Sequence, residues 1–129
     1  MPLPYILLTG LYCFLIFHNS SVADPFPVDV DLPLGDNFAH LVVFGGLCAL
    51  VSMGMSRGGA AWRVRAILPI AFTALYGLSD EVHQYFVPGR SAEVGDWLAD
   101  VGGAILAQAF LLAYWEWQRR NETSMASAG

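Results

Sequence analysis

Apolar residues occur along the chain in four long runs, separated by short polar, proline-rich or glycine-rich segments. The runs extend over Leu3 to Phe17, Phe38 to Met55, Val64 to Phe86 and Trp97 to Trp117. A helix needs about 20 predominantly apolar residues to cross a bilayer. The pattern therefore predicts four membrane-spanning helices, of which the first is short.

The first run leaves two alternatives open. Its length, and the tripeptide Ser21-Val22-Ala23 before Asp24, also suit a cleaved signal peptide. Such a signal normally carries Lys or Arg before its apolar part, and neither precedes this run. We therefore favour a retained helix over cleavage.

Composition strengthens the membrane interpretation. An ordinary soluble domain has about 25% charged residues, whereas this chain has 13% charged and 56% hydrophobic residues and a mean hydropathy of +0.51. The net charge of −5 differs from the basic balance of nucleic-acid-binding proteins, so we expect no nucleic-acid partner. Cys13 and Cys48 lie inside apolar runs, which supports neither a disulfide framework nor a cysteine-rich metal site.

The arginines indicate which side of the membrane each connection faces, because cytoplasmic loops are enriched in positive charge. Arg57, Arg63 and Arg65 lie between the second and third runs, and Arg119 and Arg120 follow the fourth. The other connections are acidic and carry a single arginine at position 90. We therefore expect an all-α, integral membrane four-helix bundle with both termini in the cytoplasm and a polar cluster at its extracytoplasmic end.

The chain then divides into four consecutive parts: a first transmembrane helix at 1–20, an acidic, proline-rich extracytoplasmic loop at 21–37, a three-helix core at 38–117 and a cytoplasmic tail at 118–129. Three prolines between Asp24 and Leu34 favour an extended loop. Glycines predict turns at 57–59 and 87–90. The segment from Asn121 to Gly129 is expected to be disordered.

Ionisable residues gather at the outer ends of the last three predicted helices. Asp36 and His40 are four residues apart and share one helix face. Asp80 shares a face with His83 and Gln84, three and four residues later, and Glu81 is adjacent. These side chains are therefore expected to come together near one membrane boundary.

The fourth helix begins with two more acids, Asp96 and Asp100, which are again four residues apart. Their face continues with Gly103 and Ala107, and small residues at this spacing let helices approach closely in lipid. The two acids are therefore expected to point into the bundle.

The predicted cluster holds more acids than positive charges, since five carboxyl groups face two histidines and Arg90. Buried like charges cannot all stay ionised. Either some carboxyl groups hold protons, or a cation, a metal or a cationic ligand group completes the site. A divalent metal held by carboxylates and histidines is one such possibility.

Each candidate residue has a functional and a structural interpretation. The catalytic candidates are His83, Asp80 and His40, with His83 as general base or metal ligand and Asp80 as its orienting partner. The candidates for ligand binding are Asp36, Glu81, Gln84, Arg90, Asp96 and Asp100. Structurally, Asp36 and Asp96 suit helix N-caps, the histidines suit core positions, and Arg90 suits either a salt bridge or an anion clamp.

These residues form a pattern that resembles the VanZ-like family of small bacterial membrane proteins. The pattern is Asp36-x-x-x-His40-x-x-x-Phe44, then Ser79-Asp80-Glu81-x-His83-Gln84-x-Phe86-x-Pro88-Gly89-Arg90, then Asp96-x-x-Ala99-x-x-x-Gly103. The resemblance covers about Asp36 to Leu112. It implies a multi-pass helical protein of the bacterial cytoplasmic membrane, related to one associated with low-level teicoplanin resistance, and it supplies no reaction.

Two positions depart from the family pattern. Asn37 stands where the family often has Lys, and Asp100 stands where it usually has Asn. Both departures make the predicted site more acidic, which favours a cationic group or a metal over an anionic group.

Three functions remain open at this point. We favour a site in the outer leaflet that binds or modifies a lipid headgroup or a lipid-linked cell-envelope precursor. The alternative is a non-catalytic accessory subunit, in which the motif locks three helices together and the partners are other protein subunits. Proton or ion movement ranks lowest, because the inner halves of the predicted spans contain no ionisable relay.

Overall fold

A computed structural model of the chain describes residues 1–22 and 36–128, with side chains for all of these except 36, 127 and 128. It contains four helices: α1 (Leu3–Ser20), α2 (Asp36–Arg57), α3 (Trp62–Tyr85) and α4 (Val94–Ala128). No strand occurs in the described ranges. The all-α prediction is therefore confirmed, with helix boundaries close to the predicted apolar runs. The predicted loop from Asp24 to Leu34 lies outside the described residues.

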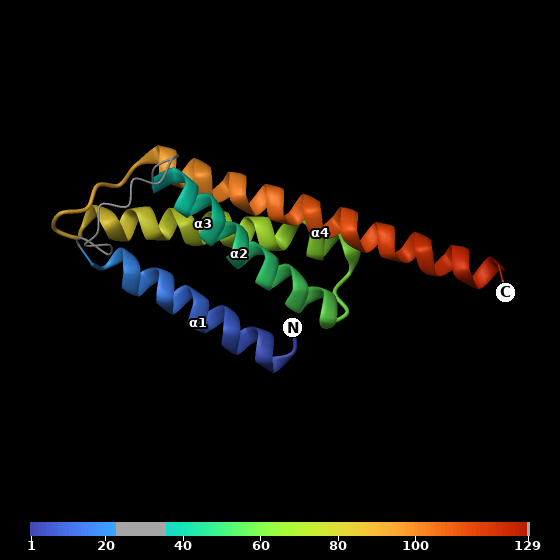
Figure 1. Ribbon diagram of the computed structural model, residues 1–129. Coiled ribbons are helices and arrows are strands. Elements are labelled where there is room, and N and C mark those ends of the chain that lie inside the picture. The colour runs from blue at the N-terminus through green and yellow to red at the C-terminus, as the bar shows by residue number, and fades with distance from the viewer. Residues whose placement is uncertain (23–35, 129) are drawn as a thin grey trace.

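The four helices run alternately in opposite directions (Figure 1). Helices α1 and α3 finish at the end of the bundle where α2 and α4 begin, and both termini of the chain lie toward the opposite end. We call the first end the polar end, because Asp80, Glu81, Asp96 and Asp100 are located there, and the second the basic end, because it carries Arg57, Arg63 and Arg65.

Three of the helices are long and apolar enough to cross a membrane, judged by length and composition alone. They are α1, residues Asn37–Arg57 of α2, and residues Val94–Ala126 of α4. Helix α3 has 24 residues and carries charged residues near both of its ends. Its role as a fourth span, and the orientation of the bundle, stay predictions.

The bundle exposes much more apolar surface than a soluble bundle does. Many large hydrophobic side chains face outward, and Leu7, Leu75 and Phe110 are each more than 60% exposed. Several acidic and amide side chains are inside, and Asp100 and Gln108 are almost fully buried. Exposed apolar surface of this extent is unfavourable in water and is stable when lipid acyl chains surround it. The fold therefore fits a helical membrane protein.

Helices α2 and α4 make the most extensive contact in the bundle. Glycines permit this contact, because a Cβ atom at Gly45 would lie 3.1 Å from the carbonyl oxygen of Gly103. A Cβ atom at Gly103 would in turn collide with the carbonyl oxygen of Leu41. The prediction that the face of Asp96, Asp100 and Gly103 points into the bundle is confirmed, since all three are buried.

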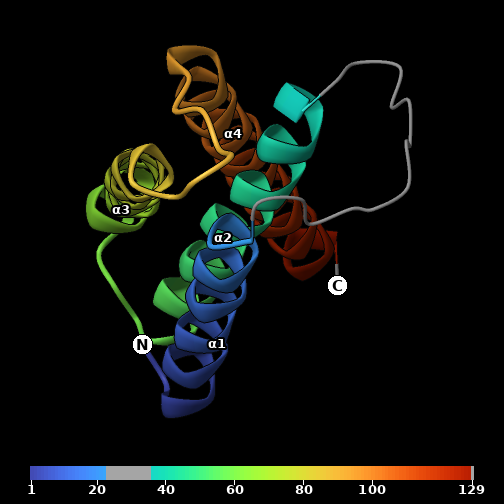
Figure 2. The same ribbon diagram turned by 90° about the vertical axis from the view of Figure 1, so that its left-hand side faces the viewer.

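An apolar core lies beside this contact. Ile16 of α1 packs against Phe44, Leu47, Val51 and Met55, which are buried along α2. Seen from the polar end, α2 lies between α1 and α4, and α3 lies beside them (Figure 2). Helix α2 is therefore the central element, and its first turns present His40 to both α3 and α4.

The two glycine turns are confirmed, but the prediction of a disordered tail is wrong. Gly59 and Gly89 have φ angles of 70° and 84°, which L side chains rarely adopt. Beyond the apolar run, α4 continues to Ala128. Glu116 pairs with Arg119 and Arg120, three and four residues later, and such pairs extend a helix past its apolar part.

Candidate functional site

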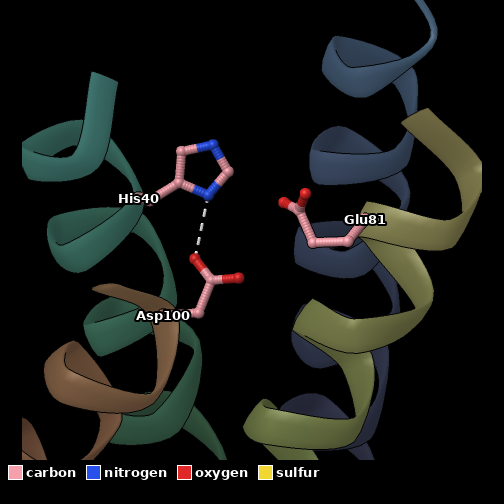
Figure 3. Close-up of side chains that lie close together, drawn as sticks. All are labelled: His40, Glu81 and Asp100. Carbon is pink, nitrogen blue, oxygen red and sulfur yellow. Dashed lines mark hydrogen bonds and ion pairs between the residues drawn. The ribbon is translucent and has the colours of Figure 1, made fainter. Parts of the chain in front are cut away.

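Three side chains from three helices converge at the polar end (Figure 3). His40 comes from α2, Glu81 from α3 and Asp100 from α4. The Nδ1 atom of His40 lies 2.9 Å from Oδ1 of Asp100, at hydrogen-bond distance. One nitrogen or oxygen atom from each side chain lies within 4.8 Å of the other two. We call these residues the three-helix cluster.

The carboxyl groups of the cluster are buried and incompletely hydrogen-bonded. Asp100 is 0% exposed and Glu81 is 6% exposed. Oε2 of Glu81 accepts a hydrogen bond of 2.8 Å from the backbone N–H of Glu93. Within the described residues, Oε1 of Glu81 and Oδ2 of Asp100 have no hydrogen-bond partner. Buried polar atoms nearly always have one, so these two oxygens require an explanation.

A glycine on α3 makes room for this arrangement. A Cβ atom at Gly77 would lie 2.5 Å from Oδ2 of Asp100, so only glycine lets that carboxyl group approach α3. Gly77 precedes Glu81 by one helical turn on the buried face of α3. The same face therefore supplies one carboxyl group and accommodates another from α4.

The remaining acid of α3 has a different environment. Oδ2 of Asp80 accepts hydrogen bonds from Oγ of Ser20, at 2.8 Å, and from Nε2 of Gln84, at 2.9 Å. His83 lies 2.9 Å from the hydroxyl of Ser21, and its ring packs against Phe17. Asp80 and His83 thus bind α1 separately, and among the described residues they do not form the predicted pair. Their catalytic roles stay predictions.

Arg90 also contacts α1. Its Nε donates to the carbonyl oxygen of Val22 at 3.0 Å, and its Nη2 donates to that of Asn19 at 2.9 Å. Of the two alternatives for Arg90, a salt bridge to the acids of α3 does not form within the described residues, and an anion clamp stays a prediction. Carbonyl groups at the C-terminal end of a helix carry partial negative charge and attract cations, which explains why the guanidinium group binds there.

The sequence suggests that Asp36 and Asp96 are helix N-caps, and the structure tests this prediction only for Asp96. Asp36 is the first residue of α2, and its side chain lies outside the described residues. Asp96 is buried in the first turn of α4, which begins two residues earlier at Val94. Asp96 is therefore inside the helix and not its N-cap, although an acid in the first turn still suits the helix dipole.

A cavity of about 330 Å³ lies next to the cluster and shares His40 with it. Its apolar lining residues come from α1 and α2 and are Tyr12, Leu15, Ile16, Ala39 and Val43. Its polar lining residues are Asn19, Ser20, His40, Gln84 and Arg90. The lining thus combines apolar surface suited to methylene groups with polar groups suited to a polar ligand group.

Sequence reasoning missed the contribution of α1 to this region. Ser20 and Ser21 bind the acid and the histidine of the α3 motif, whereas the sequence suggests for Ser21 only a place in a cleavage site. The role of Gly77 was missed as well. A polar pair directly after an apolar run, and a glycine one turn before an acid, are the available signals, but neither identifies a partner.

The arrangement allows two kinds of chemistry. A histidine that is hydrogen-bonded to a buried carboxyl group is oriented for proton transfer or for metal binding. The adjoining cavity, with its apolar and polar lining residues, suits an amphiphilic molecule.

Comparison with known proteins identifies the family. The model of the VanZ/LLP1 family matches residues 6–115, which includes most of α1 as well as the motif that carries the resemblance. No curated protein and no solved structure matches the chain. The match covers most of the sequence, and the chain belongs to the VanZ/LLP1 family.

Proposed function

We propose that this VanZ-like membrane protein binds the polar headgroup of a membrane lipid or lipid-linked envelope precursor at its polar end. The observation that carries the proposal is the cavity beside His40, whose lining combines apolar and polar side chains. Pockets for small molecules have volumes of about 300–1,000 Å³, so a volume of about 330 Å³ fits a headgroup with part of its acyl region.

The two kinds of lining residue suit the two parts of such a ligand. Leu15 and Val43 supply apolar contacts between α1 and α2, where acyl methylene groups would bind. His40, Gln84 and Arg90 supply hydrogen-bonding groups for the headgroup. In an enzymatic version of this function, His40, oriented by Asp100, is the group placed to move a proton.

The positions of the arginines indicate which membrane leaflet the polar end faces. Positive residues accumulate on the cytoplasmic side of membrane proteins, and Arg57, Arg63 and Arg65 lie at the basic end of the bundle. The polar end therefore faces the outer leaflet of the bacterial cytoplasmic membrane in this proposal. A role in glycopeptide resistance rests on family membership.

The experiment is native mass spectrometry with lipid extraction on the full chain purified in mild detergent. Val43→Trp fills the cavity, whereas the control Leu106→Trp adds the same ring to an exposed position on α4. We expect the wild type and Leu106→Trp to retain one lipid class and Val43→Trp to lose it. A wild type without lipid, or equal retention by both variants, would refute the proposal.

The hydrogen bonds to α1 support a second candidate, the accessory subunit. Asp80, His83 and Arg90 all bind α1, as expected if the motif holds helices together. In that case Asp80→Asn and His83→Gln lower the amount of folded protein in parallel with any envelope phenotype. The lipid-binding proposal instead expects these variants to fold normally, with lipid lost only when a residue that lines the cavity is changed, as in Val43→Trp.

A further inference from the structure

We propose that His40, Glu81 and Asp100 bind one divalent transition-metal ion, of the class to which Zn²⁺ and Mn²⁺ belong. This inference goes beyond the proposed lipid function, because the three ligands are defined without reference to the occupant of the cavity. It begins from the convergence of the three side chains from three helices (Figure 3).

The donor atoms match this class of ion. An imidazole nitrogen with two carboxylate oxygens is a set that Zn²⁺ and Mn²⁺ accept, whereas Mg²⁺ and Ca²⁺ prefer oxygen alone. The three donor atoms lie within 4.8 Å of one another. Ligand atoms on one tetrahedral zinc ion are about 3.3 Å apart, so the cluster needs only a small contraction of its side chains.

The two unpartnered oxygens provide independent support. Oε1 of Glu81 and Oδ2 of Asp100 lack hydrogen-bond partners among the described residues, and both side chains are more than nine-tenths buried. Figure 3 shows the carboxyl group of Glu81 directed toward His40 and Asp100. A metal ion at this point supplies the partner that the protein does not provide.

The charges lead to the same conclusion. Two carboxylates buried close together repel each other unless a positive charge lies between them. Within the described residues, no arginine pairs with Glu81 or Asp100, and the nearby Arg90 binds backbone carbonyl groups instead. A divalent cation balances two carboxylates and leaves His40 as a neutral ligand.

The surroundings hold the ligands in place, as metal sites require. The backbone N–H of Glu93 fixes one oxygen of Glu81 at 2.8 Å. The ring of His40 is stacked on Phe44, with the ring centroids 5.8 Å apart and nearly parallel planes. Because His40 also lines the cavity, a bound ion would lie next to the headgroup site and could attract an anionic group there.

The test measures metal bound to the full chain in detergent. The protein is stripped with a chelator, equilibrated with Zn²⁺, separated from excess metal and analysed for zinc. We expect about one zinc ion per wild-type chain, and at least about a tenfold loss of affinity in Asp100→Asn and Glu81→Gln. Asp80→Asn is the matched control, because this buried acid of α3 lies outside the cluster, and it should retain zinc.

A wild type that retains no more zinc than the Asp100→Asn/Glu81→Gln double variant overturns the proposal, whether or not the variants fold. So does a folded Asp80→Asn protein that loses zinc equally. Electron paramagnetic resonance of Mn²⁺ titrated into the wild type gives a second readout, and an unchanged spectrum of free Mn²⁺ would count against the site. Val43→Trp separates the two proposals, since it should lose lipid and retain zinc.

Discussion

Helices α4 and α1 are attached to the central helix α2 in different ways. Between α2 and α4, Gly45 and Gly103 bring the two backbones into contact, and neither position tolerates a Cβ atom without movement. Helix α1 packs through Ile16 and is tied at the polar end by Ser20, Ser21 and Asn19. The first contact joins two backbones, whereas in the second Gly46 and Gly54 of α2 accommodate the side chains of Tyr12 and Tyr5 of α1, and a few hydrogen bonds add to the packing.

The two proposed sites lie in these two differently packed regions. The three-helix cluster lies within α2, α3 and α4, where close backbone contact gives the fixed geometry that metal ligands need. The cavity lies where α1 faces α2 and α3, and α1 makes less contact with these helices than α4 makes with α2. A rigid part and a looser part of one small bundle thus suit an ion and an amphiphile, respectively.

The largest expected loss of stability comes from a substitution that disrupts the contact between α2 and α4. In Gly103→Ala, the new Cβ atom collides with the backbone carbonyl group of Leu41, which cannot rotate away. We expect the free energy of unfolding to fall by about 3 kcal/mol, measured by denaturant titration in detergent. Gly102→Ala is the control, because its Cβ atom meets nothing within 4 Å. Equal stability of the two variants would contradict the comparison.

A smaller loss of stability is expected from a substitution at the contact between α3 and α4. In Gly77→Ala, the Cβ atom lies 2.5 Å from Oδ2 of Asp100, so that side chain must move. We expect a loss of about 1–2 kcal/mol in stability and about a tenfold loss in zinc affinity, measured by zinc retention. If Gly77→Ala binds zinc as tightly as Gly102→Ala, Asp100 is not a ligand.

The smallest effect is expected at the attachment of α1. Ser20→Ala removes the hydrogen bond of 2.8 Å to Asp80, which keeps its bond from Gln84. Side-chain hydrogen bonds in membrane proteins contribute about 0.6 kcal/mol, and we expect a loss of that size in the free energy of unfolding. Ser79→Ala is the control, since Ser79 is exposed and bonds within its own helix. A loss as large as that of Gly103→Ala would show that α1 is not loosely attached.

Much of the fold could be predicted from local pattern. Runs of apolar residues located all four helices, and the glycines located the turns at Gly59 and Gly89. The spacing of Asp96, Asp100 and Gly103 correctly predicted the buried face of α4. The extension of α4 to Ala128 was missed, because its support comes from the contacts of Glu116 with Arg119 and Arg120, and an apolar-run criterion ignores these.

Sequence spacing could group site residues along one helix but could not find their partners on other helices. It grouped Asp80 with His83, yet among the described residues each binds at α1. It gave no sign that His40 meets Asp100, which is 60 residues away, and the predicted grouping of His40 with Asp36 falls on a side chain outside the described residues. Helical periodicity relates residues on one helix and contains no information about the rotation of one helix against another.

The sequence by itself determined the helical class, the number of helices, the polar end and the family, because each depends on local composition, periodicity or a continuous motif. The tertiary structure alone decided that His40, Glu81 and Asp100 meet while Asp80, His83 and Arg90 bind α1. The physical reason is steric. Glycines at 45, 77 and 103 fix how closely α2, α3 and α4 approach, and that separation selects which side chains can touch.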